Sequence, residues 1–216
     1  KTLIFHIDVN SAFLSWEAAY RLQQGDSLDL RDIPSAVGGN PETRHGIILA
    51  KSIPAKKYNI VTGETLHSAY GKCPSLVVVP PSYGLYIKCS NAMVDILKEY
   101  TPNVQRFSVD ECFMDLSNMQ EHYKDEVELA HKIKDRIKEE LGFTVNIGMS
   151  SNKLLAKMAS DFKKPDMVHT LFPDEISYKM WPLPIEELFM VGRATAPKLH
   201  SLNIHTIGDL AIYDKT

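Results

Sequence analysis

The chain has 216 residues, of which 44% are hydrophobic and 24% charged, a composition typical of a globular protein with one large or two small cores. Its longest apolar runs are strand-sized, so we expect no membrane span and no signal peptide, and its three cysteines lack the spacing of a zinc site or a disulfide framework. The formal net charge of −3 argues mildly against nucleic-acid binding, although lysines concentrate in residues 51–57 and 153–164.

The two ends of the chain suggest a trimmed piece of a longer protein. It begins at Lys1 rather than at a methionine, and it stops at Thr216, shortly after a helical pattern. A further C-terminal part could carry the basic charge that this chain lacks. The cysteine usage fits a reducing compartment, so we expect a cytoplasmic protein.

The first predicted elements are a strand at 3–9, a sharp turn and a helix from residue 12 that Gly25 would end. Asn10 and Ser11 are good helix-capping residues at this turn. From Gly25 to about Pro81 the chain is interrupted by many glycines and prolines, with only short strand and helix candidates between them. This region therefore reads as a small, loop-rich insert.

After the insert, apolar spacing predicts a helix at 83–100, strands around 104–109 and 112–116, a helix at 126–141 and a strand at 143–149. Together with the first strand, the order is β, insert, α, β, β, α, β. Such an order favours an α+β fold in which two helices cover one face of an antiparallel sheet, the ferredoxin-like split βαβ architecture.

Three acidic residues stand out because a turn could bring them together. Asp110 and Glu111 are adjacent, and a regular strand would send them to opposite faces, whereas a hairpin tip lets both converge. Asp8, near the end of the first strand, could reach the same spot and complete an oxygen-rich site for Mg²⁺ or Mn²⁺. The alternative is that Asp8 caps a turn and the pair is a solvated hairpin tip.

Four stretches of the chain, from residue 5 to residue 210, follow one another as FHIDVNSAF, FSVDECFMDLS, NIGMSSNKLLAKMASDFKKP and ELFMVGRATAPKLHSLNIHTIGDL. In this order and approximate spacing they resemble the motifs of the Y-family DNA polymerases, and most closely the bacterial polymerase V catalytic subunit and polymerase IV group. The resemblance implies a palm at 1–11 and 82–171, small inserted fingers at 12–81, and an incomplete helical thumb with a helix-hairpin-helix at 172–216. The family's further little-finger domain is absent from this chain.

The activity implied by the resemblance is DNA-directed DNA synthesis of the lesion-bypass kind, in DNA repair, damage tolerance and SOS mutagenesis. A dNTP would be added to the primer 3′-hydroxyl by two-metal-ion phosphoryl transfer. The resemblance assigns the two Mg²⁺ ions, for which Mn²⁺ could substitute, to Asp8, Asp110, Glu111 and the Val9 carbonyl. It also implies primer-template DNA as a partner, and a sliding clamp bound through a C-terminal element outside this chain.

The resemblance also assigns residues to the nucleotide and to DNA. Phe13 matches the steric gate that excludes a ribose 2′-hydroxyl, and Lys164 would reach the triphosphate. In the fingers motif, Ile53 and Lys56 replace the tyrosine and the arginine of many relatives, so one phosphate hydrogen bond is lost and a bidentate contact becomes a point charge. Lys56 is more like polymerase V than polymerase IV. The turn at Val191 and Gly192 would offer backbone amides to a DNA phosphate.

Two other functions fit parts of the pattern. A nucleotidyl cyclase-like enzyme has the same palm and two metal-binding acids, but needs neither the sugar gate nor the thumb-like hairpin. A catalytically silent DNA-binding accessory protein could keep the fold, although three buried acids are costly to keep without a metal. The discriminating observation is whether the protein binds primer-template DNA without extending it.

Overall fold

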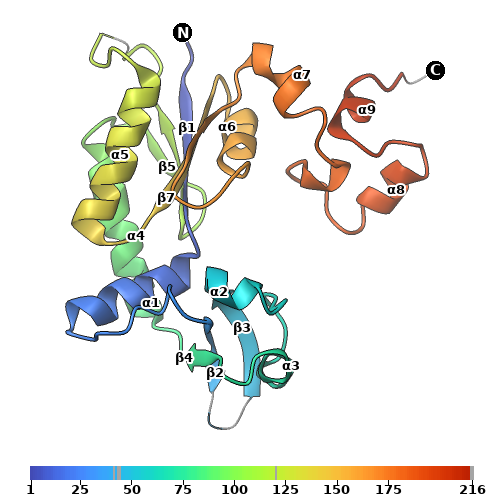
Figure 1. The fold of residues 1–216 in the computed structure, drawn as a ribbon. Helices are drawn as coiled ribbons and strands as arrows, with labels where there is room; N and C mark the ends of the chain where they lie inside the picture. Colours follow the sequence, from blue (N-terminus) through green and yellow to red (C-terminus); the bar gives the residue numbers. More distant parts are fainter. Residues whose placement is uncertain (41, 43–44, 120, 215–216) are drawn as a thin grey trace.

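The main sheet of the computed structural model has five strands, within a structure that describes residues 1–40, 42, 45–119 and 121–214 (Figure 1). The strand order is β5-β6-β1-β7-β8, and the central strand β1 pairs antiparallel with β6 and with β7. All residues of β1 and β7 are buried, so the end of β1 is fixed from both sides. The strands are β1 Ile4–Val9, β5 Val104–Arg106, β6 Glu111–Asp115, β7 Val145–Ser150 and β8 Val168–Thr170.

Helices cover both faces of this sheet (Figure 1). α4 (Tyr83–Lys98) and α5 (Glu126–Leu141) pack side by side on one face, while α6 (Lys153–Ser160) lies on the other. Asp125 caps the start of α5, and Gly142, with φ 79°, ends it in the left-handed conformation that favours glycine. The predicted α+β fold of the split βαβ type is confirmed, with β8 added parallel to β7.

Side chains alternate between the two faces of β1, and this alternation determines which face Asp8 lies on. Phe5 and Ile7 join the core cluster that also includes buried residues of α4 and α5. His6, on the opposite face, contacts Ser160 of α6 through Nδ1 and Oγ, 2.7 Å apart. Asp8 shares the face of His6, so its carboxylate is directed toward α6 and the segment that follows it.

The insert forms a second, smaller sheet, with order β3-β2-β4 and a separate core around Ile48 and Leu66. α1 joins the two parts, because Trp16 packs into the core of the main sheet while Leu14 packs against the insert. Pro41 and residues 43–44 of the predicted insert lie outside the described residues. The elements are α1 Ala12–Gln23, β2 Ser35–Asn40, β3 His45–Lys51, α2 Ile53–Lys56, α3 Leu66–Lys72 and β4 Val77–Val79.

Short helices follow β8 and form a lobe beside α6 (Figure 1). Its core includes Met180, Ile185 and Ile204, together with Leu155 and Met158 from α6. The predicted thumb range ends at residues 215 and 216, which lie outside the described residues. The helices are η1 Pro173–Glu175, α7 Ile176–Lys179, η2 Ile185–Glu187, α8 Ala196–His200 and α9 Ile207–Ala211.

Two local predictions need correction. The strand predicted at 104–109 ends at Arg106, because residues 107–110 form the turn of a hairpin into β6. Ser11 precedes α1, but it has φ 46° and its side chain makes no capping hydrogen bond. Instead, the Ser15 hydroxyl donates to the Asn10 carbonyl, 2.6 Å away. In the described part of the chain, no helix combines the length and the apolar character needed to cross a membrane.

Candidate active site

The three predicted acids meet where β1 ends and β6 begins. Asp8 and Glu111 are cross-strand partners in the β1–β6 pair, and the Val9 amide donates to the Asp110 carbonyl at 3.0 Å. The amide of Phe107 donates to the Glu111 carbonyl at 2.9 Å, which closes the hairpin. Asp110 therefore sits at the end of the turn and Glu111 at the start of the strand. This is the hairpin tip that the adjacent acids predicted.

Asp8 is buried and pairs with the ammonium of Lys164, which also contacts Asp161 Oδ1 at 2.9 Å. Burial raises the pKa of Asp8, and the nearby Glu111 charge adds to this increase, while Lys164 opposes it. Burial would lower the pKa of Lys164, but Asp8 and Asp161 outweigh it and raise that pKa. The Asp8 carboxylate is thus held in an environment that disfavours its charge despite its lysine partner.

Glu111 is held in its charged form by three side chains. His6 Nε2 lies 3.3 Å from Oε1, the Lys157 ammonium bonds to the same oxygen, and the Ser108 hydroxyl lies 3.0 Å from Oε2. These contacts, that of His6 first, lower the pKa of Glu111 to about 2 against the opposing effect of burial. The His6 nitrogen is not aligned for a full hydrogen bond, so we treat its contact as electrostatic. The Ser108 hydroxyl also lies 2.7 Å from Asp110 Oδ1.

The site offers oxygen donors of the kind that hard divalent cations prefer. No group of three or more His, Cys, Asp or Glu side chains within residues 1–40, 42, 45–119 and 121–214 is arranged as a ready metal site. Lys157 and Lys164 instead neutralise Glu111 and Asp8. The donor set fits magnesium in kind, and the metal-binding roles of Asp8, Val9, Asp110 and Glu111 stay a prediction.

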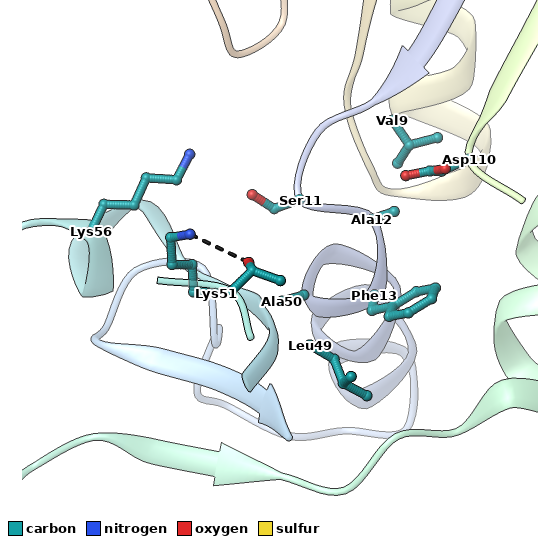
Figure 2. Close-up of a pocket in the computed structure, with 10 residues that line it drawn as sticks. Val9, Ser11, Ala12, Phe13, Leu49, Ala50, Lys51, Lys56 and Asp110 are labelled. Carbon is teal, nitrogen blue, oxygen red and sulfur yellow. Dashed lines mark hydrogen bonds between the residues drawn. The ribbon is translucent and has the colours of Figure 1, made fainter. Parts of the chain in front are cut away.

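A pocket of about 290 Å³ opens beside the acids, between α1 and the insert (Figure 2). Asp110 and Val9 form one side, and Lys51 and Lys56 come from the insert on the other side. Phe13 also lines it. The full lining is Val9, Ser11, Ala12, Phe13, Leu49, Ala50, Lys51, Lys56, Thr62 and Asp110. The pocket thus joins a carboxylate, two ammonium groups and an aromatic ring.

The ring of Phe13 is fixed by its neighbours. It stacks on Tyr86 with ring centroids 4.4 Å apart and an interplanar angle of 11°. Tyr86 is buried, and its hydroxyl donates to Glu17 Oε1 at 2.8 Å. Trp16 and Tyr83 contact the Phe13 ring at 6.1 and 6.3 Å between centroids. The sequence pattern identified Phe13 itself, but not the aromatic platform under it.

The two predicted fingers residues separate in the structure. Lys56 lines the pocket with Asp110, whereas Ile53 lines a different cavity of about 240 Å³ that includes Arg31 and Thr144. Lys51 and Thr62 line the first pocket, and sequence reasoning did not single them out. The lysine-rich run at 51–57 contains Lys51, but the sequence does not show which lysines of this run point into the pocket.

The remaining predicted residues lie in different parts of the molecule. Lys164 contacts the acids directly through Asp8. Val191 and Gly192 lie between η2 and α8, where the Gly192 carbonyl accepts from the amides of Thr195 and Ala196 at 2.9 and 3.0 Å. Gly192 is exposed, and a Cβ there would meet nothing within 4 Å. Its DNA-binding role stays a prediction.

Comparisons with known proteins agree on one family. The model of the impB/mucB/samB family matches residues 7–161. DNA polymerase IV of Clostridium acetobutylicum is 55% identical over 212 residues, covering 98% of this chain and 53% of that protein. DNA polymerase IV 1 of Bacillus subtilis (strain 168) is 41% identical over 213 residues, covering 99% of this chain and 50% of that protein.

Solved structures show the same similarity in three dimensions. The crystal structure of DinB from Sulfolobus solfataricus has a TM-score of 0.84 at 27% identity, covering 98% of this chain and 60% of that one. The insertion ternary complex of Dbh DNA polymerase has a TM-score of 0.84 at 26% identity, covering 98% and 61%. The chain spans about half the length of the curated relatives it matches.

Proposed function

Because this chain belongs to the impB/mucB/samB family, the Y-family DNA polymerases, we propose that it is the catalytic part of a lesion-bypass DNA polymerase. Its reaction is template-directed addition of a dNTP to a primer 3′-hydroxyl, in DNA repair and damage tolerance. The observation that carries the proposal is the pocket that sets Asp110 and Phe13 opposite two lysines. The relatives named above are polymerases IV, which fits the polymerase IV group.

Three of the hydrophobic cores support the division of the chain into three parts. We assign the palm to 1–11 and 82–171, the fingers to 12–81 and the thumb to 172–216. The main-sheet core, the core around Ile48 and the core around Ile185 correspond to these three parts. Two smaller clusters connect these parts, because α1 packs on the insert through Leu14 and Ala18, and α6 packs on the main sheet through Ala156.

Y-family polymerases depend on metal ions, and we assign two Mg²⁺ ions, with Mn²⁺ as a substitute, to Asp8, Asp110, Glu111 and the Val9 carbonyl. Such ions, when bound, supply charge stabilisation at the transferring phosphoryl group. The low pKa of Glu111, about 2, supports this assignment because it keeps that carboxylate charged at neutral pH. The Lys157 and Lys164 contacts show that the same oxygens already attract cationic groups.

The chain's own residues would bind and orient the nucleotide. We assign Phe13 to the sugar, because its ring lines the pocket and Tyr86 restricts its motion. Lys56 and Lys164 are assigned to the triphosphate, since Lys56 lines the pocket and the Lys164 side chain, 38% exposed, can turn from Asp8 toward a phosphate. Ile53 faces another cavity, so we assign it a packing role beside the site.

The partners follow from the reaction and the relatives. Primer-template DNA would pass between the palm and the thumb, with the turn at Val191 and Gly192 donating backbone amides to a phosphate. One similar structure is described as an insertion ternary complex of a DNA polymerase. We also propose a sliding clamp as a partner through a C-terminal element outside this chain, and a cytoplasmic location.

The test is single-nucleotide primer extension with Mg²⁺, using the full-length protein that contains this chain. We expect template-directed dNTP addition, and its loss in Asp110→Ala. Asp95→Ala is the matched control, because Asp95 is exposed on α4 and outside the pocket. Primer-template binding without extension by the unchanged protein would instead favour the silent accessory function, and cyclic nucleotide formation from a triphosphate would favour the cyclase.

A further inference from the structure

Two lysines, rather than one, face the pocket from the insert. Lys51 and Lys56 both line it, together with the Thr62 hydroxyl side chain, on the side away from Asp110 (Figure 2). Ile53, which lies between them in the sequence, lines another cavity and has no hydrogen-bonding side chain. The insert therefore presents two cationic groups and one hydroxyl group to the pocket.

A rigid turn sets the directions of the two lysines. Lys51 is the last residue of β3, and Ser52, which is 1% exposed, caps α2. The Ser52 hydroxyl donates to the Ile33 carbonyl at 2.7 Å and accepts from the Ala55 amide at 3.1 Å. These hydrogen bonds fix the backbone between the two lysines, so both ammonium groups can reach the same pocket without a change in backbone conformation.

The charge on Lys51 is poorly compensated. Its Nζ lies 3.4 Å from Thr62 Oγ1, a long contact. Within the described residues, neither Lys51 nor Lys56 forms an ion pair. Burial lowers the pKa of Lys51, the charge of Lys56 lowers it further, and Glu64 opposes both effects. The Glu64 carboxylate is itself bound to Lys72 at 2.8 Å. An anionic ligand in the pocket would relieve the repulsion between the two ammonium groups.

We propose that Lys51 is a second cationic contact to the triphosphate of the incoming nucleotide, in addition to Lys56. This inference rests on the proposed function. A triphosphate carries several negative charges along its length, so two ammonium groups reached from one turn can bind different phosphates. Lys51 thereby determines nucleotide affinity in this chain, with Thr62 holding its ammonium at the pocket wall.

The test compares Lys51→Met, which keeps the length of the side chain without its charge, with Lys57→Met. Lys57 belongs to the same lysine-rich run, but it is exposed at the end of α2 and does not line the pocket. In primer extension by the full-length protein, Lys51→Met should raise the KM for dNTP about tenfold and change kcat by less than about threefold. Lys57→Met should leave both values unchanged. The separate variant Lys51→Arg, which keeps the positive charge, should have the KM of the wild type.

A second readout needs no turnover and separates this inference from the proposed function. Inorganic tripolyphosphate should bind the unchanged protein in isothermal titration calorimetry, and Lys51→Met should weaken its binding about tenfold. Equal affinities of wild type and Lys51→Met would overturn the inference, as would an equal loss in Lys57→Met. Failure of the proposed function would appear differently, as absence of primer extension in the unchanged protein.

Discussion

Gly148 allows α6 to pack directly on the sheet, and adding one methyl group there is expected to disturb both stability and the site. Gly148 lies in β7, opposite His6 of β1. A Cβ at this position would lie 2.0 Å from the Ala156 carbonyl oxygen and 2.4 Å from the Ser160 amide nitrogen. Both are backbone atoms of α6, so no side-chain rotation can relieve the overlap.

The expected cost of Gly148→Ala follows from this geometry. Ordinary contact begins near 3.4 Å, so α6 would have to move away from β7 by roughly 1 Å or more. Overpacking of a core costs about 1–3 kcal/mol, and the upper part of that range, about 3 kcal/mol, applies where backbone must yield. For a chain of this size the melting temperature should fall by about 6–12 °C. The same movement would carry Lys157 away from Glu111, so primer extension should also weaken.

The assay is urea unfolding followed by circular dichroism, combined with a thermal melt. Gly84→Ala is the matched control, because Gly84 lies in α4 and a Cβ there would meet nothing within 4 Å. Alanine is a better helix former than glycine, so this control should be as stable as the wild type or more stable by up to about 1 kcal/mol. If Gly148→Ala unfolds at the same urea concentration as Gly84→Ala, the close packing of α6 described above is wrong.

Three further predictions concern the acids and the gate. Phe13→Val should reduce the preference for dNTP over rNTP in kcat/KM by at least about tenfold, and an unchanged ratio would contradict the gate. Glu111 has a pKa of about 2, below its unfolded value of 4.5, so it stabilises the fold above pH 4.5 and this contribution disappears as pH falls toward 2. The unfolding free energy of Glu111→Gln should therefore fall less steeply across that pH window, with a difference on the order of 3 kcal/mol at most. An unchanged slope would refute the contacts of Glu111 with His6 and Lys157. Asp8→Asn should abolish extension, because it removes a carboxylate that we assign to the metal ions, and extension at the wild-type rate would contradict that assignment.

The sequence predicted the fold well because the main elements have strong local signals. The helices at 83–98 and 126–141 show clear apolar spacing. Gly142 marks the end of the second helix, because glycine readily adopts the left-handed conformation found there. The acid pair predicted a hairpin tip from local geometry alone, since adjacent side chains of a regular strand point apart. Asp8 and Glu111 then became neighbours because the split βαβ order places β6 beside β1.

Side-chain direction and packing around the site could not be read from the sequence in the same way. Lys51 lines the pocket and Ile53 lines another cavity, and the turn between them is held by hydrogen bonds of Ser52 with Ile33, in the bend before β2, and with Ser35 of β2. Ser11 is of a residue type that often caps a helix, yet its backbone is left-handed and its side chain makes no capping hydrogen bond. Such features arise from contacts between distant segments, which no local pattern encodes.

The formal net charge of −3 does not tell where the charged groups lie in the structure. α5 carries five acidic and four basic residues and lies on the face of the sheet opposite α6 (Figure 1). α6 and the segment after it bring Lys157 and Lys164 to the acids, and the insert brings Lys51 and Lys56 to the pocket. Two of these lysines line the pocket and two contact the acids beside it, so their positions, rather than their number, would allow the proposed polyanionic substrate to bind an acidic chain.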